Sequence, residues 1–222
     1  MALTLVKCGG AALAKEPFVL ERHVEPGTGV VVVHGAGSRI SAALHEAGIE
    51  STFVGGRRIT TEEALPIIRE AFRQENVALC SEIGPRAYGL MGDDLGLEAE
   101  LLPELGHAGM LLPVVPPVLW SLLATDGVPV IAPLARGPLN VNADDAAAAL
   151  AVGLDADRVL FVTDVPGVLL EDAVVPELGA AEADRLLGGG AFAGGIVPKL
   201  EAAVRAARLG VRAEIGLTAV VP

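Results

Sequence analysis

The stretch NVNADDAAAALAVGLDADRVLFVTDVPGVL, residues 140–169, contains the pattern from which the fold can be worked out. Its alanine-rich part, residues 144–154, is typical of a helix, and the apolar run that follows is typical of a buried strand. Asparagine and aspartate precede the helix, where their side chains cap backbone N–H groups and suit the helix dipole. One cap does not require so many polar residues, and Asn140, Asn142 and Asp144 share a face if this lead-in is extended. The stretch therefore predicts a helix followed by a strand, with a polar pocket beside the start of the helix.

Strands and helices alternate along the rest of the chain in the same way. Apolar runs predict strands at residues 3–7, 29–33, 128–133, 158–163 and 211–215, with 77–83 and 90–91 as further candidates. Helical spacing of apolar residues predicts helices at 38–47, 60–73, 120–125, 182–187 and 199–209, and prolines make 111–118 a loop or an edge segment. This order predicts a single α/β domain, a three-layer α/β/α sandwich with a mainly parallel open sheet. Its ligands are expected at the carboxyl ends of the strands.

The composition agrees with one large core of aliphatic side chains. Of the 222 residues, 52% are hydrophobic but only 3% are aromatic. Ala, Val, Leu and Ile must therefore fill the interior, which favours parallel strands covered by helices on both faces. A chain of this length can bury most of its apolar surface in a single domain.

The charge and the cysteines argue against several classes of function. A net charge of −12, without a basic stretch interleaved with aromatics, argues against nucleic-acid and membrane partners but allows an anionic ligand in a pocket. Cys8 and Cys80 have no C-x-x-C spacing and the four histidines are scattered, so no metal site is predicted. No apolar run reaches the roughly 20 residues of a membrane span. The first ten residues resemble a strand rather than a signal peptide, which predicts a cytoplasmic protein.

Two glycine turns follow the first two predicted strands. Lys7 precedes Gly9 and Gly10, and Gly35 and Gly37 follow the second strand. Glycines at such places let backbone N–H groups approach phosphate oxygens, helped by the terminus of the next helix. Either turn alone also fits an ordinary tight connection, and neither matches a Walker or dinucleotide-binding loop. Two turns in succession, one with a lysine, predict a phosphate site of another type.

Lys199 and Arg58 are two further candidates for binding anions. Lys199 lies in the first turn of a predicted helix, where the helix dipole disfavours a cation unless an anion is nearby. The alternative is a solvated lysine after a proline that starts the helix. Arg58 precedes a predicted helix and has the forked guanidinium that clamps carboxylates, although surface arginine pairs are common.

Six motifs spread over nearly the whole chain carry a family resemblance. They are VKCGG at residue 6, VVVHGAG at 31, GGRRIT at 55, ELGHAG at 104, the stretch at 140–169 and GGIVPKLEAAVRAARLGV at 194. In this combination the sequence resembles the amino acid kinase family and, within it, the acetylglutamate kinases. The resemblance implies transfer of the γ-phosphoryl group of ATP to the side-chain carboxylate of N-acetyl-L-glutamate, in arginine biosynthesis. It also implies a homodimer with an acceptor-binding and dimerisation lobe at 1–154 and a nucleotide-binding lobe at 155–222.

The resemblance further implies a catalytic role for three residues. Lys7 and Lys199 stabilise the charge on the moving phosphoryl group, and Asp144 orients both lysines. No general base is required, because the attacking carboxylate is already ionised near neutral pH. Mg²⁺ arrives with ATP and is held largely by phosphate and water oxygens.

Binding roles are implied in the same way. Arg58 grips the α-carboxylate of the acceptor, and Asn140 and Asn142 bind its other polar groups. The residues expected to face the nucleotide and its phosphates are Gly9, Gly10, Gly35, Gly37, Thr163, Asp164, Gly167, Gly194 and Gly195. Asp145 is assigned to helix capping alone.

Three departures from the family pattern bear on these roles. Ala36 replaces a glycine of the family in the turn HGAG, at a cost of roughly 1 kcal/mol if its φ is positive. The connection at 11–28 is shorter than the helix that the family has there. Residues 217–222 are expected to lack the strand that usually closes the nucleotide lobe.

Two alternative functions stay open at this point. One is a related kinase of lysine biosynthesis, whose acceptor, α-aminoadipate or glutamate, is tethered to a small acidic carrier protein. Such a kinase needs a basic rim around the acceptor site, for which Arg39, Arg57 and Arg58 are the candidates. The other alternative is a non-catalytic regulatory module with the same fold, against which the intact pair of lysines argues.

Overall fold

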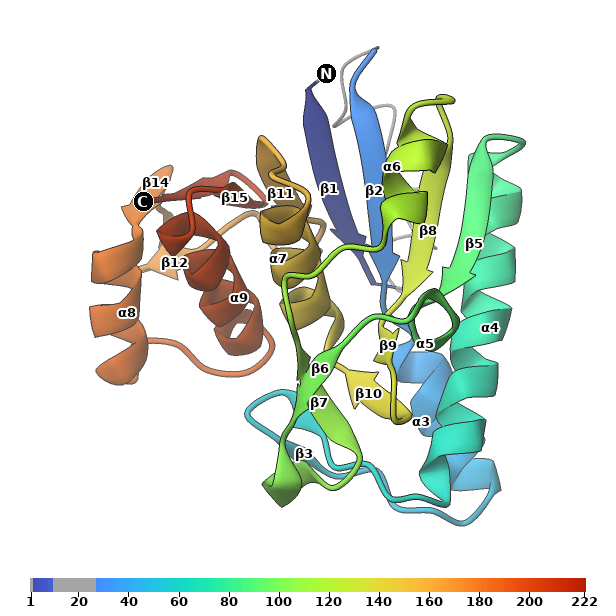
Figure 1. The fold of residues 1–222 in the computed structure, drawn as a ribbon. Helices are drawn as coiled ribbons and strands as arrows, with labels where there is room; N and C mark the ends of the chain where they lie inside the picture. The colour runs from blue at the N-terminus through green and yellow to red at the C-terminus, as the bar shows by residue number, and fades with distance from the viewer. Residues whose placement is uncertain (1, 10–26) are drawn as a thin grey trace.

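The structure is a computed structural model that describes residues 2–9 and 27–222, and a twisted sheet runs through its centre (Figure 1). In this part of the chain the main sheet has eight strands in the order β14-β16-β15-β11-β1-β2-β8-β5. They are β1 (Leu3–Cys8), β2 (Gly29–His34), β5 (Ala87–Met91), β8 (Val128–Ala132), β11 (Arg158–Phe161), β14 (Glu177–Gly179), β15 (Arg212–Ile215) and β16 (Thr218–Val221). Neighbouring strands are parallel except β15 and β16, which pair antiparallel. The central strands therefore end at one edge of the sheet, where folds of this kind bind ligands.

Helices cover both faces of this sheet. They are α3 (Gly37–Glu46), α4 (Ala64–Ile83), α5 (Gly92–Leu95), α6 (Pro117–Leu123), α7 (Ala143–Gly153), α8 (Ala180–Gly188) and α9 (Ile196–Arg208). On one face α7 packs on β1, β2 and β11, and α9 packs on β11, β15 and β16. On the other face α4 packs on β5 and β8 and contacts α3. The predicted α/β fold with three layers and a mainly parallel sheet is confirmed.

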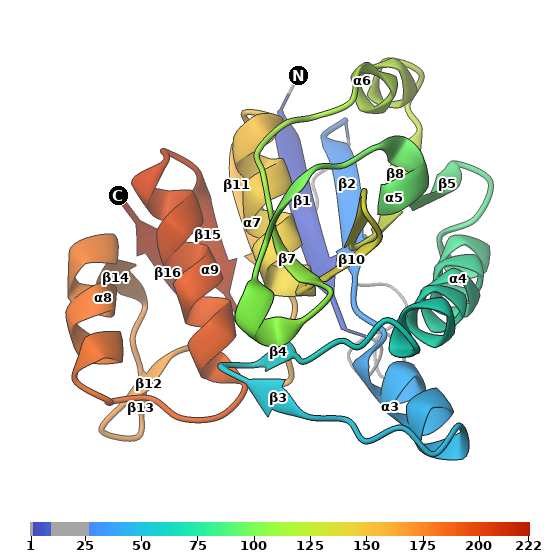
Figure 2. The same cartoon turned by 60° about the horizontal axis from the view of Figure 1, so that its bottom comes forward.

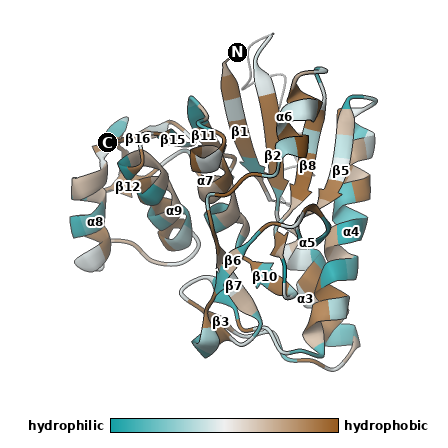
Figure 3. Ribbon diagram, in the orientation of Figure 1, coloured by the Kyte–Doolittle hydropathy of each residue, from teal (hydrophilic) through white to brown (hydrophobic). Residues whose placement is uncertain are grey.

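The central strands are apolar on both faces, as the brown colour of the sheet in Figure 3 shows. Leu5 and Val31 point to the layer of α7 and α9, while Val6 and Val32 point to the opposite layer and pack with Leu79 of α4. Successive side chains of a strand point to opposite faces, so a run of apolar residues is what a doubly covered sheet requires.

Smaller sheets lie around the edge where the central strands end. One has the order β6-β7-β10-β9, formed by β6 (Ala99–Leu101), β7 (Ala108–Leu111), β10 (Leu139–Val141) and β9 (Leu134–Ala135). The two hairpins are β3 (Phe53–Val54) with β4 (Arg57–Arg58), and β12 (Leu169–Leu170) with β13 (Ala173–Val174); a short 3-10 turn, η1, spans Pro103–Leu105. Strand β10 leads directly into α7 and so carries the NVNAD segment to this edge.

The predicted strand at 77–83 is wrong, because these residues form the second half of α4. The helix begins at Ala64 rather than at residue 60, and its first N–H also bonds Oγ1 of Thr61 at 3.3 Å. Ile68, Phe72 and Leu79 are among its buried residues, at helical spacing. The segment around Leu79 satisfies both a strand and a helix pattern over a few residues, and only the longer window favours the helix.

Two of the expected departures from the family pattern are also corrected by the structure. Residues 218–221 form β16, which pairs with β15 and β14, so a strand does close this side of the sheet. Ala36 has φ −138° and incurs no cost of a left-handed backbone. The short connection at 11–28, the third departure, lies almost wholly outside the described residues, as does Gly10.

We expect the stability of the protein to fall as the pH is lowered from 7 to 5, because of His34. This side chain is fully buried, its Nε2 lies 3.0 Å from Nδ2 of Asn76, and burial lowers its pKa to about 4. Between pH 7 and pH 5 the unfolded chain, in which the pKa of histidine is near 6.5, binds a proton at His34, whereas His34 of the folded protein stays largely unprotonated. The free energy of unfolding should therefore drop by about 2 kcal/mol between pH 7 and pH 5 from this residue. Urea unfolding at both pH values should show a smaller drop in His34→Gln, and an equal drop would contradict the assignment.

Candidate functional site

Two cavities adjoin at the carboxyl ends of the central strands. The smaller, of about 230 Å³, is lined by the ends of β1, β2, β4 and β10 and by the start of α7. The larger, of about 600 Å³, lies between the loop after β11 and the start of α9. Gly9 lines both cavities, so a ligand in one can reach a ligand in the other.

Asp144 lies between two lysines where the cavities meet. The Nζ atoms of Lys7 and Lys199 each lie 3.0 Å from the same oxygen, Oδ1 of Asp144. The side chains come from the end of β1, the first turn of α7 and the first turn of α9, and each is at most 11% exposed. The carboxylate of Asp144 is an anion of the kind that the dipole argument requires beside Lys199.

The electrostatics of this cluster favour an anionic ligand. Burial alone would raise the pKa of Asp144, but the charges and hydrogen bonds of Lys7 and Lys199 outweigh it and the pKa lies below its usual value. Burial and repulsion from Lys7 lower the pKa of Lys199, against the attraction of Asp144. Two ammonium groups and one carboxylate leave one positive charge, and each ammonium has three N–H donors. A phosphoryl group would supply both the charge and the acceptors.

Arg58 is a buried guanidinium that faces the smaller cavity. Its Nη2 donates to the carbonyl of Gly37 at 3.3 Å and to Oγ of Ser41 at 3.0 Å, and its Cζ lies 4.4 Å from the ring centre of Phe53. Burial lowers its pKa, and Nη1 has no hydrogen-bond partner among residues 2–9 and 27–222. A buried cation with an unpaired donor is suited to a carboxylate ligand.

The two asparagines of the NVNAD segment line the same cavity but differ in their bonds. Nδ2 of Asn140 donates to Oγ1 of Thr60 at 3.0 Å. Asn142 caps α7, since its Oδ1 accepts from the N–H groups of Asp144 at 2.8 Å and Asp145 at 3.2 Å. Its Nδ2 donates to the carbonyl of Gly56 at 3.1 Å, so both polar atoms of the Asn142 side chain already have hydrogen-bond partners within the protein.

Asp145 has a different place from the predicted one. It does not cap α7; its side chain is fully buried and pairs with Arg57 and Arg205. The adjacent arginines of GGRR and the adjacent aspartates of NADD suggest ion pairs between the two motifs, but the neighbouring sequence does not show which arginine pairs with which aspartate.

The glycine turns also need one correction. Gly9, Gly35 and Gly37 line the smaller cavity, but the N–H of Gly35 donates to the carbonyl of Cys8 at 2.8 Å and is not directed at a ligand. Ala36 lines the cavity too, just before α3, whose first N–H groups have no acceptor within the helix. The turn before α3, rather than Gly35 itself, is the backbone candidate for holding phosphate.

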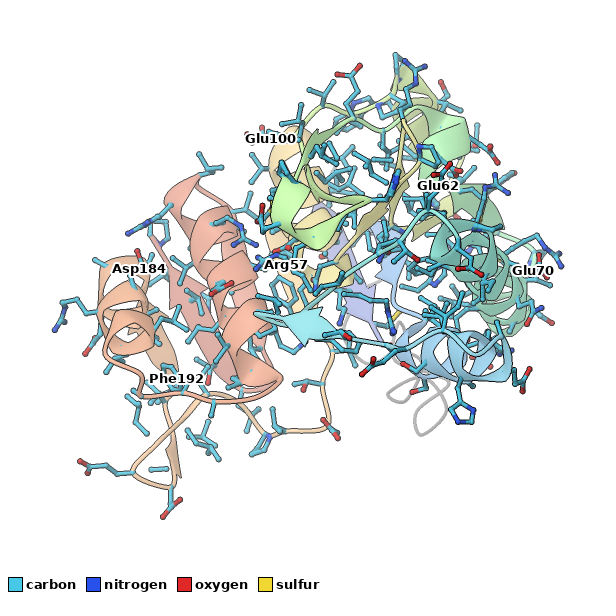
Figure 4. The ribbon with its side chains drawn as sticks, turned by 90° about the horizontal axis from the view of Figure 1, so that it is seen from below. Arg57, Glu62, Glu70, Glu100, Asp184 and Phe192 are labelled. Atoms are coloured by element: carbon cyan, nitrogen blue, oxygen red, sulfur yellow. The ribbon has the colours of Figure 1, made fainter. Side chains whose placement is uncertain are left out.

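The larger cavity is mainly apolar. Thr163, Asp164, Gly167 and Gly195 line it with Lys199, whereas Gly194 does not line it and lies in the turn before α9 with φ +72°. Phe192, which sequence reasoning missed, also lines this cavity and lies on the loop between α8 and α9 (Figure 4).

In the described chain no three His, Cys, Asp or Glu side chains group as a metal site. None of the helices in the described residues has both the length and the apolarity needed to cross a membrane.

Residues 2–216 match the amino acid kinase family. The chain belongs to this family. It is 41% identical to an acetylglutamate kinase of Rubrobacter xylanophilus over 97% of this chain and 88% of the relative, and 39% identical to one of Jannaschia sp. over 100% and 84%. The solved structure of smu.665 from Streptococcus mutans superposes with a TM-score of 0.85 at 23% identity, covering 99% of this chain and 98% of that one. The family membership and fold expected from the six motifs are confirmed.

Proposed function

We propose that this amino acid kinase transfers the γ-phosphoryl group of ATP to the side-chain carboxylate of N-acetyl-L-glutamate. The products are ADP and N-acetyl-L-glutamyl 5-phosphate, an acyl phosphate of arginine biosynthesis. The observation that carries the proposal is the lysine–aspartate–lysine cluster between two cavities, one of which contains a buried arginine whose Nη1 has no partner among the described residues. The relatives named above, at 39% and 41% identity, support the choice of acceptor.

The three clustered residues have distinct roles in this reaction. An oxygen of the acceptor carboxylate forms the new bond to the γ-phosphorus, and the bond to the β-phosphate oxygen breaks. Lys7 approaches the transferred group from the smaller cavity and Lys199 from the larger one, and both stabilise the negative charge that shifts between donor and acceptor. Asp144 holds the two ammonium groups in place, so little reorganisation is needed when the charge moves.

The two cavities divide the ligands. Arg58 binds the α-carboxylate of the acceptor through Nη1, and Asn140 and Asn142 border its remaining polar groups. The nucleotide occupies the larger cavity, next to Thr163, Asp164, Gly167 and the Gly194–Gly195 turn, while Gly9 and Gly37 lie on the phosphate side. Mg²⁺ enters with ATP, with phosphate and water as its main ligands.

We also propose that the chain is divided into two lobes and forms a dimer. Residues 1–154 serve acceptor binding and dimerisation, residues 155–222 serve the nucleotide, and the enzyme acts as a homodimer in the cytoplasm. Val77 of α4 and Tyr88 of β5 are 59% and 44% exposed, and β5 is an edge strand of the main sheet. Apolar side chains beside an open edge support contact with a second copy there.

The carrier-linked alternative has less support from the geometry. Of the three arginines expected to form a basic rim, Arg39 pairs with Glu75 and Arg57 pairs with Asp145. Both charges are therefore neutralised within the protein, and Arg58 is buried in the cavity rather than displayed around it.

An ATP-dependent hydroxamate assay tests the proposed function, since hydroxylamine traps acyl phosphates. Free N-acetyl-L-glutamate should give the highest kcat/KM, above glutamate and α-aminoadipate. The N-acetyl group removes the positive charge that a free amino group would bring close to Arg58 and the two lysines. Turnover only of a carrier-linked acceptor would favour the alternative kinase, and no hydroxamate from any acceptor despite ATP binding would favour a non-catalytic module.

A further inference from the structure

In Figure 2 the β3–β4 hairpin lies beside the start of α9, the helix that carries Lys199. Phe53 and Arg58 of the same hairpin line the smaller cavity. Its turn residue Gly56 has φ +74°, and a Cβ atom there would lie 2.5 Å from Cγ of Pro198 in the first turn of α9. The carbonyl of Gly56 accepts from Asn142 at the start of α7. The turn is thus packed against the residue before Lys199, with no room for a side chain.

An ionic network holds the hairpin in this position. Nε of Arg57 lies 2.7 Å from Oδ2 of Asp145, and Nη2 lies 3.1 Å from Oδ1, a forked pair. Nη2 of Arg57 also lies 3.4 Å from Oε2 of Glu201, and Arg205 pairs with Asp145. Glu201 and Arg205 are one turn apart on α9, so this network joins the hairpin, α7 and α9. Figure 4 labels Arg57 beside α9. We call these four residues the Arg57 clasp.

The charges of the clasp balance. Two guanidinium groups face two carboxylates, and the Asp145 side chain is 0% exposed while that of Arg57 is 16% exposed. Burying such charges is costly unless each is paired, and the best supported use of buried ionic groups is to select one arrangement of the elements. The clasp therefore carries no net charge that would attract a ligand, which favours a role in positioning the hairpin, α7 and α9.

Each element of the clasp carries a residue of the reaction site within two positions of its clasp residue. Arg57 adjoins Arg58 on β4, Asp145 adjoins Asp144 on α7, and Glu201 lies two residues after Lys199 on α9. A rotation of the hairpin away from α9 would move Arg58 relative to the lysines. Displacements of about 1 Å in such arrangements cost up to a hundredfold in rate.

We propose that Arg57 is a positioning residue that holds the acceptor-binding hairpin closed against α9, and so sets the distance between the acceptor and the transferred phosphoryl group. This inference rests on the proposed function, because it assigns Arg58 to the acceptor and Lys199 to the phosphoryl group. Arg57 also lines the smaller cavity, but its guanidinium is paired with Asp145 and Glu201, so we assign it to act through Arg58 and Lys199 rather than to bind the acceptor.

The test compares Arg57→Ala and Arg57→Lys with a matched control, Arg69→Ala. Arg69 likewise pairs with two carboxylates, Asp93 at 2.7 Å and Asp94 at 2.7 Å, but outside both cavities. Arg57→Ala should lower kcat/KM for N-acetyl-L-glutamate roughly ten- to a hundredfold, mostly through kcat because the acceptor is held out of line with the phosphoryl group, with little change in the KM for ATP. Arg57→Lys should recover part of the loss, and Arg69→Ala should match the unmodified enzyme. Equal kinetics of Arg57→Ala and Arg69→Ala would overturn the proposal.

Two further measurements separate positioning from simple loss of stability or of function. A double-mutant cycle compares Arg57→Gln, Asp145→Asn and the double variant, which removes one charge of each sign. Their effects on kcat/KM should be strongly non-additive, and additive effects would contradict action through Asp145. Hydrogen exchange of residues 51–59 should be faster in Arg57→Ala than in Arg69→Ala, whatever the substrate is. An unmodified enzyme that fails to phosphorylate N-acetyl-L-glutamate would refute the proposed function, whereas unchanged exchange in Arg57→Ala would refute the clasp.

Discussion

Replacing Lys199 with alanine is expected to lower kcat by about a thousandfold while the protein stays folded. The lysine presents a buried ammonium group at the junction of the two cavities, 3.0 Å from Asp144. Such a preoriented cation stabilises a transition state far more than water does, since it is already in place when charge moves. Water entering the vacated space cannot reproduce the charge.

The fold should survive because Asp144 keeps its second partner. Nζ of Lys7 lies 3.0 Å from Oδ1 of Asp144 in the unmodified protein, so loss of the Lys199 side chain should not leave this buried carboxylate without a cation. Circular dichroism and thermal unfolding check the fold, and coupled ADP release measures turnover. Arg73→Ala, which removes an exposed partner of Glu70, serves as the control. Turnover of Lys199→Ala within tenfold of the unmodified enzyme would refute the assigned role.

Arg58→Ala is expected to raise the KM for N-acetyl-L-glutamate by about a hundredfold and to leave the KM for ATP nearly unchanged. The guanidinium is buried in the smaller cavity, two protein oxygens hold Nη2, and Nη1 has no partner in the part of the chain described. A carboxylate that binds there gains a charge-assisted hydrogen bond with little loss of side-chain freedom. Removing the arginine leaves the ligand carboxylate desolvated and unpaired, which costs about 3 kcal/mol.

The conservative variant separates charge from geometry. Arg58→Lys keeps the positive charge but lacks the fork that bonds Ser41 and the ligand together, so we expect an intermediate KM. Steady-state kinetics with each substrate varied in turn measures both constants. A KM for ATP that rises as much as that for the acceptor would place Arg58 outside the acceptor site.

Much of the fold follows from local patterns. Apolar runs followed by glycines predicted β1 and β2, and helical spacing predicted α7 and α9, because both patterns record burial along a short segment. The error at 77–83 arose where Leu79 and its neighbours satisfy two periodicities at once. The exposed face of α4, which resolves the ambiguity, is visible only once the whole helix is considered.

Less of the candidate site than of the fold could be predicted from the sequence. Lys7, Asp144 and Lys199 are named by their motifs, and the structure brings the three side chains together. The N–H of Gly35 was misjudged because its acceptor, the carbonyl of Cys8, lies on a neighbouring strand. Nor does any motif show that Nη1 of Arg58 is buried without a partner.

Local patterns alone determine the alternation of strands and helices and the kinds of side chain available for chemistry, since these depend on residues a few positions apart. The cap of α7 was expected from Asp145 but is supplied by Asn142. The pairing of Asp145 with Arg57 and Arg205, which lie 88 and 60 positions away from it, depends on the tertiary structure. A carboxylate at the start of a helix gains from the dipole wherever the helix lies, whereas a buried ion pair depends on which elements pack beside it. For that reason adjacent aspartates, alike in sequence, face different partners: Asp144 faces the lysines of the reaction site and Asp145 faces the arginines of the clasp.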